Sequence, residues 1–126
     1  MWEDGDVAIL NIDELASEDG PSLLKIEGEI DLDTVGILRG KLEELKGRGV
    51  SRLILDFSAT RYVNSSALAV LVKYAETFRE AGGGIALAAV SPRVKLVFEM
   101  LGLLVFFKFC DSVDDAKSAF PDEAQG

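Results

Sequence analysis

Residues 53–78 read LILDFSATRYVNSSALAVLVKYAETF. The opening run, 53–55, is short and continuously apolar, as is typical of a strand buried on both faces, and Asp56 marks its expected end. A polar stretch over 58–64 is expected to be a loop. Apolar residues then recur at helical spacing, at Leu68, Leu71, Val72, Ala75 and Phe78. The stretch therefore predicts a buried strand, a loop, and a helix that begins at the Asn64-Ser65-Ser66 turn.

The same alternation of strand and helix patterns continues on both sides of this stretch. Toward the N-terminus it predicts an antiparallel hairpin of strands over 7–12 and 24–30, a turn over 17–22, and a helix over 35–45 capped by Asp33. Toward the C-terminus it predicts strands over 85–90 and 104–109, a helix over 94–101 introduced by Ser91-Pro92, and a short helix over 113–120 capped by Asp111 or Ser112. Glycines at 47, 49, 82–84 and 102 end the three longer helical patterns.

The alternation also indicates the fold class. Strands separated by helices pair in parallel through right-handed crossovers, and adding each strand beside its predecessor places the helices mostly on one face. We therefore expect one α/β domain over residues 1–120, a β-α superhelix with a mainly parallel mixed sheet of about five strands and about four helices. Residues 121–126 are expected to form a disordered tail.

The charge balance favours protein partners. The chain has 22 acidic and 13 basic residues and a net charge of -9, whereas contacts to phosphates need clustered Lys or Arg. The acidic N-terminal stretch does not match a signal peptide, and no apolar run reaches the length of a membrane span. We therefore expect a cytoplasmic protein that binds no nucleic acid and does not insert into membranes.

The chain contains no histidine, which excludes Ser-His-Asp and Cys-His catalysis and the usual His-containing metal sites. Lysine or carboxylate chemistry stays formally open, but no pair of carboxylates stands out. The single Cys110 is expected to be a small buried apolar residue, and the Gly82-Gly83-Gly84 run lacks the Lys-Ser/Thr of a phosphate-binding loop. The sequence thus predicts a binding module without a cofactor, a metal or catalytic residues.

The Asn64-Ser65-Ser66 turn is the strongest candidate for function, because partners of open sheets meet the carboxyl ends of the strands. Asn64 is a good N-cap, and it leaves Ser65 and Ser66 in a first helical turn whose free N–H groups and dipole suit an anion. A phosphoserine there would bring a charge of about -2 and would act mainly on whatever docks nearby. The alternative is that these residues simply cap the helix, and the spacing alone favours that alternative.

This segment resembles the signature of the STAS family, the sulphate transporter and anti-sigma factor antagonist domains. In that family an Asp-Leu-Ser stretch leads into Asp-Ser-Ser-Gly-Leu, and here the stretches are Asp56-Phe57-Ser58 and Asn64-Ser65-Ser66-Ala67-Leu68. The similarity covers nearly the whole chain, including Gly28-Glu29-Ile30-Asp31, Ser91-Pro92-Arg93-Val94 and Leu101-Gly102-Leu103. The fold of the family, a β-α superhelix, agrees with the periodicity.

The resemblance implies an anti-sigma factor antagonist that binds an anti-sigma factor. That partner is also a serine kinase, whose phosphorylation of the antagonist ends the binding, and a phosphatase is a further expected partner. Carried over by position, the phosphoacceptor is Ser66, with Ser65 as the fallback. Asn64 stands where the family usually has Asp and Ala67 where it usually has Gly, so the turn has lost a negative charge and some backbone freedom.

Four further residues complete the expected partner-binding loop. Asp31 matches a family acid near the phosphorylation loop, although it could instead cap the first helix together with Asp33. Asp56 either meets the partner or hydrogen-bonds the loop backbone. Arg61 and Tyr62 are expected to be exposed, and both residue types are enriched at the centres of interfaces.

Two other functions stay open at this stage. The departures at Asn64 and Ala67 suit a STAS subunit that is not phosphorylated and that braces the ATPase of a lipid-trafficking transporter or another regulatory complex. A nucleotide sensor or enzyme that uses the same loop is the third possibility, although nothing in the sequence specifies a base or a metal.

Overall fold

The computed structural model describes residues 10–15 and 20–120. In chain order the elements are β1 (Leu10–Leu15), β2 (Ser22–Ile30), α1 (Val35–Gly47), β3 (Arg52–Val63), α2 (Ser65–Glu80), β4 (Gly84–Ala88), α3 (Pro92–Met100), the 3-10 helix η2 (Leu104–Phe106), β5 (Lys108–Cys110) and α4 (Val113–Ser118). The expected strand start at 7–9, residues 17–19 of the expected turn over 17–22, and the expected tail over 121–126 lie outside the described residues. None of the helices in the described part has both the length and the apolar character needed to span a bilayer.

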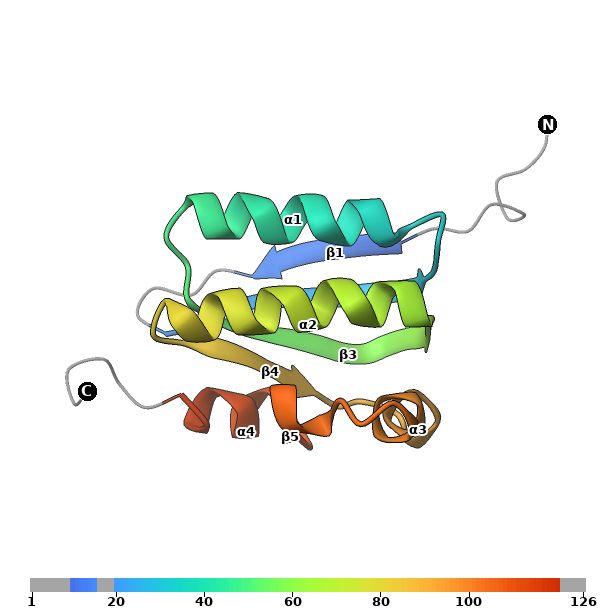
Figure 1. The fold of residues 1–126 in the computed structure, drawn as a ribbon. Helices are drawn as coiled ribbons and strands as arrows, with labels where there is room; N and C mark the ends of the chain where they lie inside the picture. The colour runs from blue at the N-terminus through green and yellow to red at the C-terminus, as the bar shows by residue number, and fades with distance from the viewer. Residues whose placement is uncertain (1–9, 16–19, 121–126) are drawn as a thin grey trace.

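The five strands stand in chain order across one sheet. β1 pairs antiparallel with β2, and every later pair is parallel. Figure 1 shows α1 and α2 side by side across one face of this sheet, with α3 seen end-on near the end of β3. The helices therefore lie mostly on one face, as the alternation of strands and helices predicts.

Alternate side chains of β3 show which helix covers which face. Leu53 and Leu55 belong to the core that α1, α2 and α3 cover, whereas Ile54 packs with Ala116 of α4 and with Phe120. Because successive strand residues point to opposite faces, α4 lies on the face opposite the other three helices. The chain therefore passes to the other face of the sheet between β5 and α4. Because helices cover both faces there, β3 and β4 are buried on both faces.

The expected end of the third strand at Asp56, and the expected loop over 58–64, are wrong. β3 continues to Val63 and stays paired with β2 through Thr60↔Gly28 and Val63↔Ile30. Two register shifts interrupt this pairing, so buried and exposed positions do not alternate regularly. Buried Thr60 is compatible with the strand because its hydroxyl donates a hydrogen bond to the Ile26 carbonyl oxygen at 2.7 Å.

The expected strand over 104–109 is also only partly correct. Residues Leu104–Phe106 form η2, and β5 is limited to Lys108–Cys110, which pairs with the last residues of β4. A short apolar run does not by itself distinguish a strand from a single helical turn, so periodicity could not separate them. β1 differs in the other direction, since it extends beyond the expected end at 12 to pair Leu15 with Leu23.

An ion-pair network joins β1 to α1. The Glu14 Oε1 atom lies 2.9 Å from Lys41 Nζ, and its Oε2 atom lies 2.7 Å from Arg48 Nη2. Hydrogen bonds from Arg48 and then Lys41 lower the pKa of Glu14 from 4.5 to about 2. The hairpin is therefore attached to the helix layer by a carboxylate that stays charged well into the acid range.

We expect this network to make stability depend on pH. Because the pKa of Glu14 is lower in the folded chain than the usual 4.5, its stabilising effect is complete above about pH 4.5 and is lost as the pH falls toward 2. Thermal melts followed by circular dichroism should show that Glu14→Gln melts below the wild type near neutral pH and loses less stability over that acid range. Glu80→Gln, at an exposed carboxylate on α2, serves as the control. If the melting temperatures of Glu14→Gln and the wild type fell equally between pH 4.5 and pH 2, the expectation would be contradicted.

Candidate functional site

The N-terminus of α2 has the predicted Asn64 cap. The backbone of Asn64 is extended, with φ -94° and ψ 175°, and its Oδ1 atom accepts a hydrogen bond from the Ala67 N–H at 2.9 Å. Ala67 and Leu68 are buried and anchor the first turn on the core. Ser65 is consequently exposed and Ser66 is half-buried, so both hydroxyls lie at the surface end of the helix.

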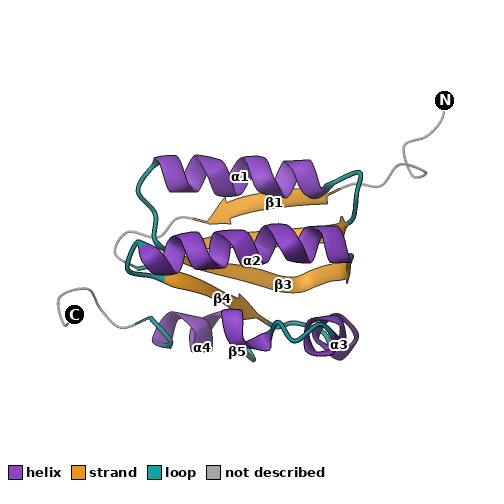
Figure 2. Ribbon diagram, viewed as in Figure 1, coloured by secondary structure: helices purple, strands orange, loops and turns teal. Residues whose placement is uncertain are grey.

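The turn between β2 and α1 lies next to this helix end. The Asn64 N–H donates a hydrogen bond to the Ile30 carbonyl oxygen at 2.9 Å, which holds the ends of β2 and β3 together. Figure 2 shows that the chain enters α1 and α2 at the same end of the molecule. Asp31 follows Ile30 directly and is therefore brought close to the start of α2.

Asp31 fixes the turn that precedes α1, but it does not occupy the cap position, which is Thr34 and has no side-chain cap hydrogen bond. Its Oδ1 atom accepts hydrogen bonds from the N–H groups of Asp33 at 3.0 Å and Thr34 at 3.1 Å, and its carbonyl oxygen accepts from Val35 N–H at 2.8 Å. The expectation that Asp33 caps α1 is wrong, because Asp31 already bonds the free N–H groups of this turn. Asp31 remains half-exposed beside the α2 terminus.

Thr34 is a residue of this site that the sequence analysis missed. Thr34 is buried, and its hydroxyl donates a hydrogen bond to the Glu29 carbonyl oxygen at 2.7 Å. The Thr34 hydroxyl oxygen in turn accepts a hydrogen bond from the Asp31 N–H at 2.9 Å. These bonds fix the turn to the end of β2. A threonine just before an apolar helix stripe is a general capping signal, and it could have drawn attention to this position.

Arg61 and Tyr62 are exposed, as expected, but they belong to β3 and not to a loop. Tyr62 is 48% exposed and is the Cα partner of Glu29 on β2. An Arg61 Nη2 atom lies 3.7 Å from the Glu29 carboxylate. The last residues of β3 therefore present a cation and an aromatic ring next to the start of α2.

Asp56 is not brought to this surface. It lies in the middle of β3 opposite Ala88, about 20 Å along the strand from Val63. Its Oδ1 atom accepts a hydrogen bond from the Ser58 N–H at 2.9 Å, which is the local backbone bond offered as its alternative role. Its side chain also points to the face opposite that of buried Phe57.

The residues that do converge form what we call the α2-tip surface, made of Asp31, Leu32, Arg61, Tyr62, Asn64, Ser65 and Ser66. Leu32 is 73% exposed, an unusual position for a large apolar side chain. It places exposed apolar area in the turn that follows Ile30, the residue whose carbonyl oxygen accepts a hydrogen bond from the Asn64 N–H. A surface with apolar and aromatic groups beside hydroxyls at a helix N-terminus suits docking of another protein and acceptance of an anion.

Comparison with known proteins identifies the fold family. The model of the STAS domain family matches residues 14–116, which is most of the chain. The chain belongs to the STAS domain family. The resemblance drawn from the residues around Ser65 and Ser66 is thereby confirmed at the level of the family.

The relatives of this STAS domain include named anti-sigma factor antagonists. It is 28% identical over 102 residues to BtrV of Bordetella bronchiseptica, a candidate anti-sigma factor antagonist by its name, covering 81% of this chain and 88% of BtrV. An anti-sigma factor antagonist from Mycobacterium paratuberculosis has a TM-score of 0.76 at 24% identity, covering 94% and 97% of the two chains. SpoIIAA has TM-scores of 0.72 in its unphosphorylated form and 0.67 in its phosphorylated form, at 20% and 19% identity. The two comparisons cover 84% and 86% of this chain and 92% and 98% of SpoIIAA.

We expect Asn64→Ala to lower the free energy of unfolding of this STAS domain by about 1 kcal/mol, because the Ala67 N–H loses its acceptor. Asn64→Asp keeps the acceptor and adds a negative charge at the favourable end of the helix, so it should be at least as stable as the wild type. Urea unfolding measures both changes. Asn11→Ala, at an exposed position of β1, is the matched control, and an equal loss in both alanine variants would contradict the capping role.

Proposed function

We propose that this STAS domain is an anti-sigma factor antagonist that binds its anti-sigma factor through the α2-tip surface. The observation that carries the proposal is the exposure of Ser65 at the start of α2 and of Leu32 in the neighbouring turn between β2 and α1, two turns that Asn64 and Asp31 fix. The names of the relatives support it. Binding would sequester the anti-sigma factor and free the sigma factor for transcription, and the domain itself would carry out no chemistry.

In the proposed switch, the anti-sigma factor is also a serine kinase and phosphorylates Ser66. The first turn of α2 can hold a phosphate, since its N–H groups and the helix dipole favour a negative charge there. The added charge of about -2 would therefore leave the helix folded and act on the partner, which must either desolvate the phosphate or face its repulsion. Ser65 is the more exposed of the two residues and is the fallback acceptor. A phosphatase would complete the cycle, and all of these partners are expected in the cytoplasm.

A second candidate is a STAS subunit that braces the ATPase of a transporter without being phosphorylated. The observation that favours it is the chemistry of the turn, where Asn64 caps the helix with a neutral amide and buried Ala67 has no glycine freedom. Nothing in this alternative requires a modified serine. Asn64 and Ala67 would then be sufficient to build the turn as a rigid support.

Binding experiments separate the two candidates. The proteins encoded next to this chain are purified, and calorimetry measures the affinity of the wild type, Ser66→Ala and Ser66→Asp for each of them. The antagonist function is supported if an anti-sigma factor kinase binds this domain and if the sigma factor of that kinase competes with the domain for it. An ATPase subunit that binds all three forms equally well, with no binding to an anti-sigma factor, would select the transporter subunit.

A further inference from the structure

A pocket of about 300 Å³ lies at the other end of α2, away from the serines. Its lining comes from the last turns of α2, the turn into β4 and the start of that strand, the η2–β5 segment, and Phe120 beyond the end of α4. The key side chains are those of Arg79, Val105, Phe107, Lys108 and Phe120. Arg79 is separated from Ser66 by about 20 Å along the helix, so the pocket and the α2-tip surface are separate sites.

The pocket exists because β5 is shorter than β4 and leaves the start of β4 unpaired on that edge. β5 begins only opposite Ala86, so Gly84 and Ile85 at the start of β4 have no strand beside them on that edge. The 3-10 helix η2 occupies this side of the sheet but leaves the space open. Gly84 adds no side chain, and a Cβ atom at this position would lie 3.9 Å from the Phe120 ring. The Gly84 backbone and the Phe120 ring are therefore neighbours in the lining of the pocket.

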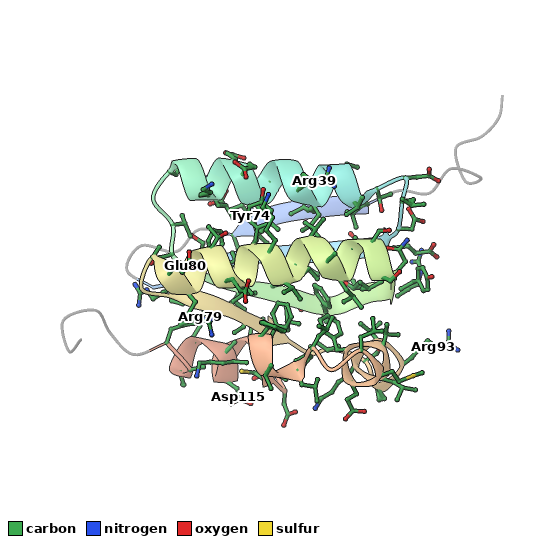
Figure 3. The ribbon with its side chains drawn as sticks, in the orientation of Figure 1. Arg39, Tyr74, Arg79, Glu80, Arg93 and Asp115 are labelled. Atoms are coloured by element: carbon green, nitrogen blue, oxygen red, sulfur yellow. The ribbon has the colours of Figure 1, made fainter. Side chains whose placement is uncertain are left out.

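The pocket combines an apolar floor with a basic rim. Phe107 and Phe120 are each 8% exposed and form part of the floor. Arg79 and Lys108 come from different elements, and Figure 3 shows Arg79 leaving the last turn of α2 toward the side where α4 lies. The side chain of Arg79 is 66% exposed, and its ion pair with Glu76 is long, at 4.0 Å. Lys108 forms no ion pair with the residues that the structure describes.

We propose that this pocket binds a small amphipathic monocarboxylate, with its apolar body on the aromatic floor and its carboxylate between Arg79 and Lys108. The guanidinium group offers paired N–H donors that match a carboxylate. The volume is at the lower end of the range for small-molecule sites, which suits an aryl or short alkyl acid. The net charge of -9 repels a polyanion more strongly than a monoanion, which disfavours nucleotides at this site.

A titration of the whole chain followed by ¹H–¹⁵N NMR tests the proposal, with phenylbutyrate as the probe and uncharged phenylbutanol as its matched control. We expect saturable shifts at the backbone amides of Gly83, Gly84 and Val105, and an affinity for phenylbutanol that is lower by about tenfold. Equal affinities for the acid and the alcohol would overturn the proposal, as would the absence of saturable shifts at these amides.

Charge reversal locates the binding. The double variant Arg79→Glu/Lys108→Glu should bind phenylbutyrate more weakly by about tenfold or more, because the rim then repels the carboxylate. Lys73→Glu/Arg93→Glu changes the net charge equally at exposed positions outside the pocket, and it should keep the wild-type affinity within about twofold. A similar loss in both double variants would overturn the proposal. No partner protein is needed, so the result is independent of the proposed antagonist function.

Discussion

Replacing Ser66 with aspartate should weaken binding of the anti-sigma factor by about 30-fold, or about 2 kcal/mol. The new carboxylate lies on the α2-tip surface, where a docking partner must either desolvate it or meet it with its own charges. The fold itself should not suffer, because a negative charge in the first turn of α2 interacts favourably with the helix dipole. The effect should therefore appear in the affinity and not in the melting temperature.

Calorimetry gives the affinity, and circular dichroism melts give the stability of the same samples. Ser58→Asp makes the same charge change at an exposed position in the middle of β3, away from the α2-tip surface, and should bind like the wild type. Ser66→Ala should also keep its affinity. If Ser58→Asp were as damaging as Ser66→Asp, net charge and not the location of the serine would control the binding.

Replacing Phe98 with alanine should lower the free energy of unfolding by about 3–5 kcal/mol, the largest stability effect that we predict. Phe98 is completely buried, and its ring meets Phe107 edge to face at a centroid distance of 5.5 Å and Phe109 at 5.3 Å. These ring contacts help to join α3 to the C-terminal segment. Alanine would leave a cavity that these rings, held by their own backbone segments, cannot fill completely.

Denaturant unfolding measures this loss, and Leu96→Ala provides the comparison within the same helix. Leu96 is 51% exposed, so its truncation should change the free energy of unfolding by less than about 1 kcal/mol. If the two variants lost similar amounts of unfolding free energy, the packing of α3 on the core would not depend on Phe98.

The features that the sequence predicted well are those that depend on local interactions. The α1 stripe of Leu38, Leu42 and Leu45 is fully buried, as the helical spacing indicates. The caps at Asn64, Ser91 and Ser112 each accept a hydrogen bond from an N–H group three residues ahead. Such bonds form within one turn, so the residue types alone are enough to place them.

The features that it missed depend on contacts between distant segments. The continuation of β3 is fixed by its pairing with β2 across two register shifts. Thr60 can be buried because its hydroxyl donates a hydrogen bond to the Ile26 carbonyl oxygen. Thr34 likewise depends on the carbonyl oxygen of Glu29. Because β3 continues past Asp56, that residue is far from the α2-tip surface, although the serines were placed correctly by the local cap.

The most direct test of the account is to locate the phosphate after incubating the domain with ATP and the anti-sigma factor kinase. Mass spectrometry of the digested product should place the phosphate on Ser66, and the Ser66→Ala variant should not acquire it there. Phosphate found only outside Ser65 and Ser66 would contradict the proposed switch.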